Sequence, residues 1–207
     1  MKELNEIVVI DYGCGNLESV VNIIEHVGGY AEISNDPSVI GKYQKIVLPG
    51  VGHFKYGMEC LKNSGLIPVL EERRSSGAKI MGICLGMQLM TAFSEEGNCS
   101  GLGWFPVKTI KFPNEVNGKK LIVPHMGWNN ISVIKQVTSI IPEDSRFYFV
   151  HSYYVDAVHE ECCLTASSYG GVDFASSIHQ DNLFGFQFHP EKSHISGMRL
   201  FKEFLKI

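Results

Sequence analysis

The pentapeptide Gly82-Ile83-Cys84-Leu85-Gly86 is the segment of this 207-residue chain best suited to covalent chemistry. A buried strand is predicted before it and a helix after it, so Cys84 would lie at a sharp strand-to-helix turn. The two glycines remove side chains that would clash at such a turn. The helix N-terminus would favour the thiolate of Cys84, and the Leu85 N–H would face a developing oxyanion. A buried cysteine between two packing glycines fits the same pattern.

A histidine that could serve as the base occurs in His189-Pro190-Glu191. Pro190 disfavours the helical conformation at His189, and residues i and i+2 of an extended segment point to the same side. Glu191 can therefore orient the ring of His189, as the third member of a Cys-His-acid triad does. A hydrogen-bonded pair without catalytic function is the alternative. His194 extends the pattern to H-x-E-x-x-H, but Pro190 breaks the helix that such a metal motif needs, so we expect no metal.

A third motif, Pro49-Gly50-Val51-Gly52, directly follows a predicted strand. Its two glycines leave backbone N–H groups unshielded and able to reorient, which suits a second donor to an oxyanion. Taken alone, this tetrapeptide is better explained as a plain turn. All three motifs fall at strand ends of one predicted parallel sheet, and open α/β sheets bind their ligands there.

The elements that must position these motifs alternate between strand and helix in the first half of the chain. Strands are predicted at 7–10, 30–33, 46–48 and 78–83, and helices at 17–27, at 54–74 with a break near Gly65 and Pro68, and at 85–93. This alternation predicts a parallel sheet. From 101 to 189 the chain is rich in β-branched and aromatic residues, with strands predicted at 147–150 and 184–188. We expect antiparallel pairing there, a hairpin connection at 180–182 and a final helix at 194–206.

Composition narrows the class of protein. Apolar residues make up 44% of the chain, and its formal net charge is −4, so a folded core is expected and nucleic acid is not an expected partner. No apolar run approaches the length of a membrane span, and the acidic N-terminus does not resemble a signal peptide. The six cysteines form no CxxC pair. We therefore expect one α/β domain over residues 1–207 in the reducing cytoplasm, with no membrane or cofactor.

The chain resembles the class I, triad-type glutamine amidotransferases along its whole length, and within them the glutaminase subunits of imidazole glycerol phosphate synthase. The elbow at 82–88 and the segment 189–193 match the superfamily as a whole. Five further segments complete the match: 11–17, 49–52, 94–97, 124–129 (Pro-His-Met-Gly-Trp-Asn) and 150–153. Two of them, 49–52 and 124–129, narrow the resemblance to the glutaminase subunits. The resemblance implies a flavodoxin-like amidotransferase fold, with a mostly parallel central sheet flanked by helices and an added antiparallel portion.

The resemblance also implies the chemistry. Cys84 would attack the side-chain amide of L-glutamine, His189 would transfer protons and Glu191 would orient His189. Gln88 and Glu96 match positions that hold glutamine, and Glu96 suits the α-ammonium group. Gly50, Val51 and Gly52 match the oxyanion strand.

A partner is implied as well. Ammonia would pass to a (βα)8-barrel cyclase, bound as a heterodimer, which forms imidazole glycerol phosphate and an aminoimidazole ribotide (AICAR) in histidine biosynthesis. The face that meets the cyclase matches Asn16, Met126, Trp128, Tyr148 and Lys192. Trp128 and Tyr148 are large, stiff and amphipathic, which suits interface anchors. Core packing is the alternative for Trp128, and a solvated surface position is the alternative for Lys192. Cys14, Cys60, Cys99, Cys162 and Cys163 match no function and are interpreted as packing residues.

Three other functions remain open at this stage. The same half-reaction could supply ammonia to a cyclase-like partner that amidates or amidinates a surface-polysaccharide sugar, because the acceptor binds the other chain. A stand-alone hydrolase could use the same elbow and triad, although it would need no docking face. A non-catalytic relative is the weakest alternative, because Cys84, His189 and Glu191 are all present.

Overall fold

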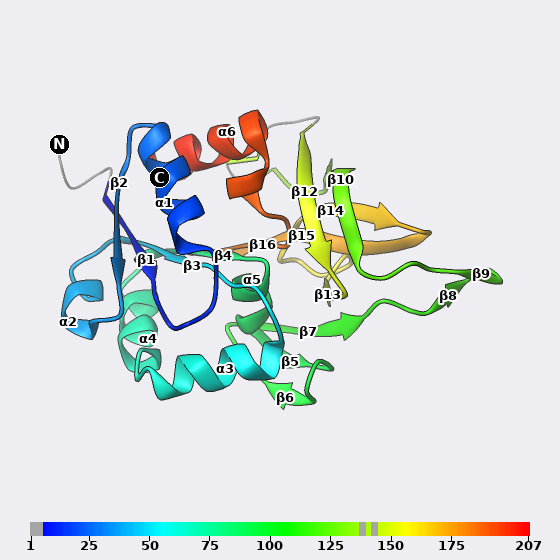
Figure 1. Cartoon of the computed structure of the whole chain (residues 1–207), viewed down its shortest axis with the longest axis horizontal. Coiled ribbons are helices and arrows are strands. Elements are labelled where there is room, and N and C mark those ends of the chain that lie inside the picture. Colours follow the sequence, from blue (N-terminus) through cyan, green and yellow to red (C-terminus); the bar gives the residue numbers. More distant parts are fainter. Residues whose placement is uncertain (1–5, 137–139, 142–144) are drawn as a thin grey trace.

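The computed structural model describes residues 6–136, 140–141 and 145–207. A mixed sheet runs through its centre, with helices on both faces (Figure 1). One half of this sheet is parallel and has the spatial order β2 (Tyr30–Ser34), β1 (Glu6–Ile10), β3 (Lys45–Leu48), β4 (Lys79–Ile83) and β16 (Leu183–Phe186). The four strands predicted in the first half of the chain are confirmed, with their ends shifted by at most one residue.

The helices bury their apolar faces against both sides of the parallel strands. Figure 1 shows α1 (Leu17–His26) and α6 (His194–Phe204) on one side and α3 (Phe54–Asn63) and α4 (Ile67–Ser75) on the other. Side chains of β1 point alternately to the two faces of the sheet. Val9 therefore packs in the apolar cluster with α1 and α6, and Val8 packs in the cluster with α3 and α4. Two short helices complete this half, α2 (Pro37–Ile40) and α5 (Leu85–Leu89).

The other half of the sheet is mainly antiparallel, as the second half of the sequence predicted. It continues from β16 through β15 (Val172–Gln180), β13 (Tyr153–Asp156), β7 (Phe105–Lys111), β5 (Thr91–Ser94) and β6 (Cys99–Ser100). On its other edge β15 pairs with β14 (Cys163–Tyr169), which pairs with β11 (Ser132–Val133). The loop between β15 and β16 contains only Asp181 and Asn182, which confirms the predicted hairpin, and Asp181 adopts the left-handed conformation (φ 54°).

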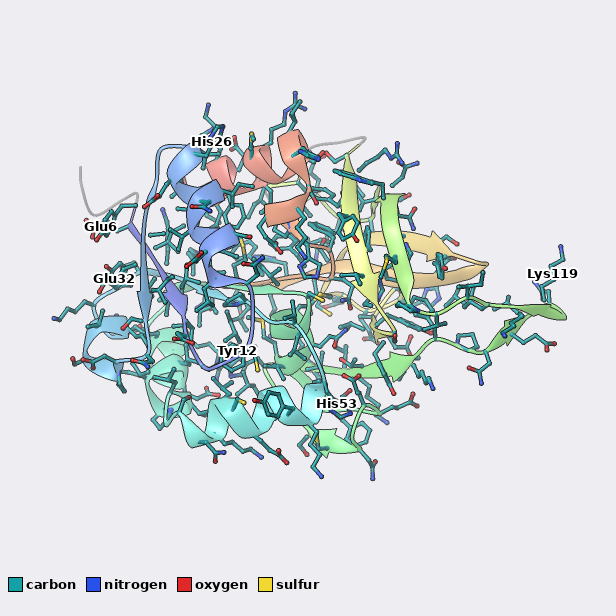
Figure 2. The ribbon with its side chains drawn as sticks, in the orientation of Figure 1. Glu6, Tyr12, His26, Glu32, His53 and Lys119 are labelled. Carbon is teal, nitrogen blue, oxygen red and sulfur yellow. The ribbon has the colours of Figure 1, made fainter. Side chains whose placement is uncertain are left out.

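A two-stranded antiparallel ribbon stands apart from the main sheet. It consists of β10 (His125–Asn130) and β12 (Arg146–His151), and its β12 strand packs against α6. The chain reaches β10 through the hairpin of β8 (Glu115–Val116) and β9 (Lys119–Lys120). Figure 2 shows Lys119 at the tip of this hairpin, far from the parallel half.

Two predictions of local structure need correction. The helix predicted at 85–93 ends at Leu89, and residues Thr91–Ser94 form strand β5 instead. Pairing with β7 decides this, because Thr91 lies opposite Phe105 in a parallel ladder that sequence periodicity does not reveal. The predicted break near Gly65 and Pro68 is confirmed, but Pro68 lies in the first turn of α4, where a proline is tolerated. Among the described residues, no helix is long and apolar enough to cross a membrane.

Candidate active site

Cys84 lies at a sharp turn between β4 and α5, as the elbow motif predicted. Its backbone is in the left-handed region (φ 52°), which a residue other than glycine adopts only where surrounding structure holds it. A methyl group on Gly86 would come within 1.9 Å of the Leu48 carbonyl oxygen, and one on Gly82 within 2.7 Å of the Met87 nitrogen. Both glycines of the motif are therefore required by close backbone contact, and the predicted elbow is confirmed.

His189 and Glu191 form the hydrogen-bonded pair that their spacing predicted. His189 is extended (φ −101°, ψ 92°), and its Nδ1 lies 2.8 Å from Oε1 of Glu191. The two side chains are 1% and 3% exposed, so the pair is shielded from solvent. The backbone N–H of His189 donates to the Tyr148 carbonyl, which fixes the segment against β12. Nε2 of His189 has no hydrogen-bond partner among the described residues, so it is available to a reacting group.

The electrostatics of this histidine favour its charged form. Burial alone would lower the pKa of His189, but the negative charges of Cys84 and Glu191 outweigh burial and raise the pKa to about 10. The surroundings therefore favour a proton on His189, beside the sulfur of Cys84. Such a pair holds both a nucleophile and a proton donor in one place.

A cavity of about 290 Å³ opens onto this pair. It is lined by Val51, Gly52, Cys84, Leu85, Gln88, Glu96, Pro124, Val150, His151, Ser152, Tyr153 and His189. Residues from three strand ends and from the loop after β3 therefore meet at one place, and they span more than one hundred positions of the sequence. The register explains this, because Leu48 lies opposite Gly82 and Phe186 lies opposite Ile83.

The segment predicted as an oxyanion strand divides into two parts. Val51, 43% exposed, and Gly52, at φ 110°, line the cavity together with Leu85, the first residue of α5. Gly50 is buried behind it, where a methyl group would lie 2.6 Å from the Tyr12 hydroxyl and 2.8 Å from Cβ of Leu85. The tight packing at Gly50 anchors the segment beside the elbow, and the exposed part beyond it has room to rotate.

Gln88 and Glu96, predicted to bind glutamine, both line the cavity. Nε2 of Gln88 donates to the Tyr153 carbonyl and to Oε1 of Gln187, both at 3.0 Å. Both of its protons are thus used, which leaves the amide oxygen as an acceptor. Oε2 of Glu96 accepts the Phe54 N–H at 2.7 Å, which holds the carboxylate at the N-terminus of α3. Gln88 and Glu96 thus bring two acceptor groups to the cavity wall from different elements.

Gln187 is a residue near the nucleophile that sequence reasoning missed. Its side chain is fully buried, and its Nε2 lies 3.7 Å from Sγ of Cys84, as a donor to the sulfur. The sequence carried one signal, since Gln187 is the only polar side chain in the apolar run 184–188. This donor matters because α5 has five residues instead of the nine predicted, which reduces the contribution of the helix dipole.

The five residues predicted to meet a partner lie on the surface around the ribbon and the start of α6. Met126 and Trp128 on β10 are 60% and 41% exposed, so core packing is wrong for Trp128. The Trp128 ring stacks on His194 with centroids 5.5 Å apart and makes an edge contact with Tyr148 on β12. Lys192 and Asn16 are exposed, and Asn16 also caps α1 by accepting the Ser19 N–H. Met126 lies opposite Val150 in the ribbon, and Val150 lines the cavity, so this face adjoins the cavity wall.

The remaining cysteines lie apart from the triad. Cys14, Cys162 and Cys163 are buried, whereas Cys60 and Cys99 are half-buried, and all five are free thiols. Burial raises the pKa of Cys163 to about 12 and, with help from Cys60, that of Cys14 to about 11. Neither thiol is ionised at neutral pH, which fits packing residues. In the part of the chain that the structure describes, no three His, Cys, Asp or Glu side chains gather as metal ligands do.

Comparison with known proteins decides the family. The family model described as "Glutamine amidotransferase class-I" matches residues 8–207. The chain belongs to the class I glutamine amidotransferase family. It is 46% identical over 204 residues to "Imidazole glycerol phosphate synthase subunit HisH 2" of Pseudomonas aeruginosa, covering 97% of this chain and 99% of the relative. It is 45% identical over 203 residues to the protein of the same name in Methanococcus maripaludis, covering 97% and 98%.

Solved structures of this family share the fold. A structure described as "Crystal structure of glutamine amidotransferase" superposes with a TM-score of 0.73 at 13% identity, covering 96% of this chain and 98% of that one. The mostly parallel sheet with an added antiparallel portion, flanked by helices, is thus the fold of the family, as the sequence predicted.

Proposed function

We propose that this amidotransferase is a glutaminase subunit, which releases ammonia from L-glutamine for a separate cyclase subunit in histidine biosynthesis. The observation that carries this proposal is the meeting of Cys84, His189 and Glu191 at one cavity. The names of the relatives supply the pathway, and identity over nearly the full length of both chains supports carrying it over.

The first half-reaction follows from the charges of the pair. The thiolate of Cys84 attacks the side-chain amide carbon of glutamine and forms a tetrahedral oxyanion. His189 then donates its Nε2 proton to the amide nitrogen, which leaves as ammonia, while the carbonyl re-forms as a glutamyl thioester. Glu191 keeps the ring oriented through Nδ1 in both protonation states.

The second half-reaction returns the site to its starting state. Neutral His189 removes a proton from water, and the hydroxide attacks the thioester carbon. Collapse of this second oxyanion expels the thiolate of Cys84 and releases glutamate. The histidine again carries a proton, so the balance is glutamine plus water to glutamate plus ammonia.

Substrate recognition is assigned to residues on the cavity walls. Glu96 and the amide oxygen of Gln88 suit the α-ammonium group of glutamine, because both are acceptors at the cavity wall. The N–H groups of Leu85 and of the segment Val51–Gly52 suit the oxyanion. Gly50 contributes indirectly, by seating that segment against α5.

The partner is inferred to be a (βα)8-barrel cyclase that docks on the face formed by Asn16, Met126, Trp128, Tyr148 and Lys192. Exposed Met126 and Trp128 supply apolar and aromatic anchors there, and the face adjoins the cavity wall. Ammonia would cross this wall to the cyclase, which forms imidazole glycerol phosphate and AICAR. The cytoplasmic location expected from the sequence stays a prediction.

One observation favours a second candidate function, in which the ammonia goes to a different acceptor molecule. Both reported relatives are named as the second HisH of their organism, so a chain of this kind can be one of two copies. A duplicated glutaminase could serve a cyclase-like partner that acts on a polysaccharide sugar, with an unchanged triad.

Glutamate release by the purified chain tests the proposal, measured alone and with the histidine-pathway cyclase carrying its nucleotide ligand. We expect a rise of at least about a hundredfold on adding the loaded cyclase. No rise, with Cys84 still alkylated by a glutamine-like electrophile, would overturn the histidine pathway in favour of the second acceptor. Full activity without any partner would indicate a stand-alone hydrolase.

A further inference from the structure

Two buried histidines outside the triad lie at the end of the ribbon that adjoins the cavity. His125 begins β10 and His151 ends β12, and they are directly opposite each other in the antiparallel register. They are 3% and 6% exposed, and His151 lines the cavity. Nδ1 of His125 lies 3.0 Å from Nε2 of His151, so two ionisable rings share one hydrogen bond.

The direction of that hydrogen bond follows from its surroundings. Nδ1 of His151 lies 2.8 Å from the Tyr153 carbonyl, which can only accept, so His151 carries its proton on Nδ1. Its Nε2 must then accept the proton from Nδ1 of His125. Nε2 of His125 is left as an acceptor for the side-chain amide of Asn129, at 3.4 Å. Both rings are thus fixed as neutral Nδ1–H tautomers.

The environment keeps both rings neutral. Burial lowers the pKa of His125 to about 4, and burial together with the charge of His189 lowers the pKa of His151 to about 3. The His125 ring is also clamped between Phe149 and Tyr169, whose centroids lie 5.0 and 4.2 Å away. A proton added to either ring would break one of the hydrogen bonds that connect Asn129, His125 and His151.

The same carbonyl connects the histidines to the catalytic cavity. Tyr153 accepts the Nδ1–H of His151 and also one proton of Gln88. The second proton of Gln88 goes to Oε1 of Gln187, which turns the Gln187 amide nitrogen toward Sγ of Cys84. Two series of donors therefore converge on the Tyr153 carbonyl. One runs from Asn129 through His125 to His151, and the other comes from Gln88, whose second proton orients Gln187 beside Cys84.

We propose that His125 and His151 are positioning residues, which hold Gln88 in place by fixing the Tyr153 carbonyl to which both His151 and Gln88 donate. The proposal rests on the proposed function, since it names further residues for the same reaction. Asn129 anchors the outer end, because its second amide proton goes to the Ser168 carbonyl at 2.9 Å. The neighbour of Asn129 on β10 is Trp128, whose side chain belongs to the predicted docking face.

Matched substitutions at His125 test whether these hydrogen bonds position Gln88. His125→Phe keeps the stacking on Phe149 and Tyr169 but removes the donor, whereas the amide of His125→Asn can replace the Nδ1–H. With the cyclase and its ligand bound, we expect His125→Phe to raise the KM for glutamine about tenfold with kcat within twofold, because Gln88 loses its orientation. His125→Asn should recover most of this loss. Equal loss in both variants, or no loss in either, would overturn the proposal.

A spectroscopic measurement keeps the proposal testable if a variant fails to fold. The ¹⁵N chemical shifts of the histidine rings in the wild-type protein distinguish the two neutral tautomers. We expect His125 and His151 both as Nδ1–H tautomers at pH 7, and an Nε2–H tautomer at either would overturn the chain. Absence of glutamate release from the wild-type complex would instead overturn the proposed function and leave the ring spectra readable.

Discussion

His189 and the pair formed by His125 and His151 lie within one small region, yet the protein holds them in opposite charge states. The pKa of His189 is raised to about 10, and those of His125 and His151 are lowered to about 4 and 3. All three rings are nearly inaccessible to solvent. Burial therefore cannot be what distinguishes them.

The difference lies in what each ring contacts. His189 faces a carboxylate on one side and the nucleophilic sulfur on the other, and both favour its positive charge. The pair faces a backbone carbonyl, a side-chain amide and aromatic rings, which offer hydrogen bonds but no negative charge. The charge of His189 also opposes a proton on His151. His189 moves protons, whereas His125 and His151 fix the orientation of other groups. The groups that each ring contacts determine which of these roles it has.

Removing the nucleophile gives the largest expected effect and tests the first half of the comparison. In Cys84→Ala, glutamate release should fall to background, while affinity for the cyclase stays within about twofold. The pKa of His189 should fall below about 10, because one of the two charges that raise it is gone. An NMR titration of the rings checks this, with His125 and His151 remaining neutral above pH 5. Loss of cyclase binding would show that Cys84 is structural.

Removing the other charge gives the next largest effect. Glu191→Gln keeps the shape of the side chain but removes the carboxylate that orients His189, so kcat should fall about a hundredfold or more. The KM for glutamine should change little, because Glu191 does not line the cavity. Glu203→Gln, which removes a carboxylate on α6 that pairs with Lys206 outside the cavity, is the control and should retain wild-type activity. Equal activity in both variants would contradict the triad.

Acid stability tests the second half of the comparison. The folded pKa of His151 is below its ordinary value of 6.5, so the unfolded chain binds the proton first as pH falls. This contribution is intact above pH 6.5 and is lost progressively down to about pH 3, which amounts to about 2 kcal/mol at pH 5. His125 adds a smaller loss over pH 6.5 to about 4.

Urea unfolding at pH 7 and pH 5 measures this loss. His151→Asn keeps a donor for Tyr153 but does not titrate, so its free energy of unfolding should fall by about 2 kcal/mol less than that of the wild type over this range. His26→Asn is the control, because His26 is exposed on α1 (Figure 2), and it should follow the wild type. An identical loss in the wild type and His151→Asn would mean that His151 is not held neutral.

The sequence predicts the catalytic region well because its signals are local. The elbow needs only the glycines on either side of Cys84. His189 and Glu191 pair across Pro190 as predicted, although Pro190–Lys192 form a short 3-10 helix instead of the extended segment expected. The parallel strands are short β-branched runs that leave no other assignment. Local chemistry of this kind can be interpreted without knowing which strands pair.

The positioning region was not predicted, because it depends on strand register. His125 and His151 are 26 residues apart and meet only because β10 and β12 pair in one register. Gln187, the residue after β16, reaches Cys84 from more than one hundred residues away in the sequence. The strand Thr91–Ser94 was missed for the same reason, since its partner β7 decides against the helix. Long-range pairing is what a single sequence shows least.

The docking face gives the smallest expected effect and separates docking from the hydrogen-bond chain beside it. Trp128→Ala removes an exposed aromatic anchor on β10 but leaves its neighbour Asn129 in place. Cyclase affinity should weaken about tenfold, and kcat at saturating cyclase should stay within twofold. The free energy of unfolding should change by less than about 1 kcal/mol, because the ring is 41% exposed and contacts only His194 and the edge of Tyr148 among aromatic groups of the described chain.

Titration calorimetry measures the affinity for the cyclase, and the ¹⁵N shifts of the histidine rings show whether the hydrogen bonds of His125 and His151 are unchanged. Unchanged affinity would remove Trp128 from the docking face, whereas altered His125 and His151 tautomers would mean that docking and positioning are one unit.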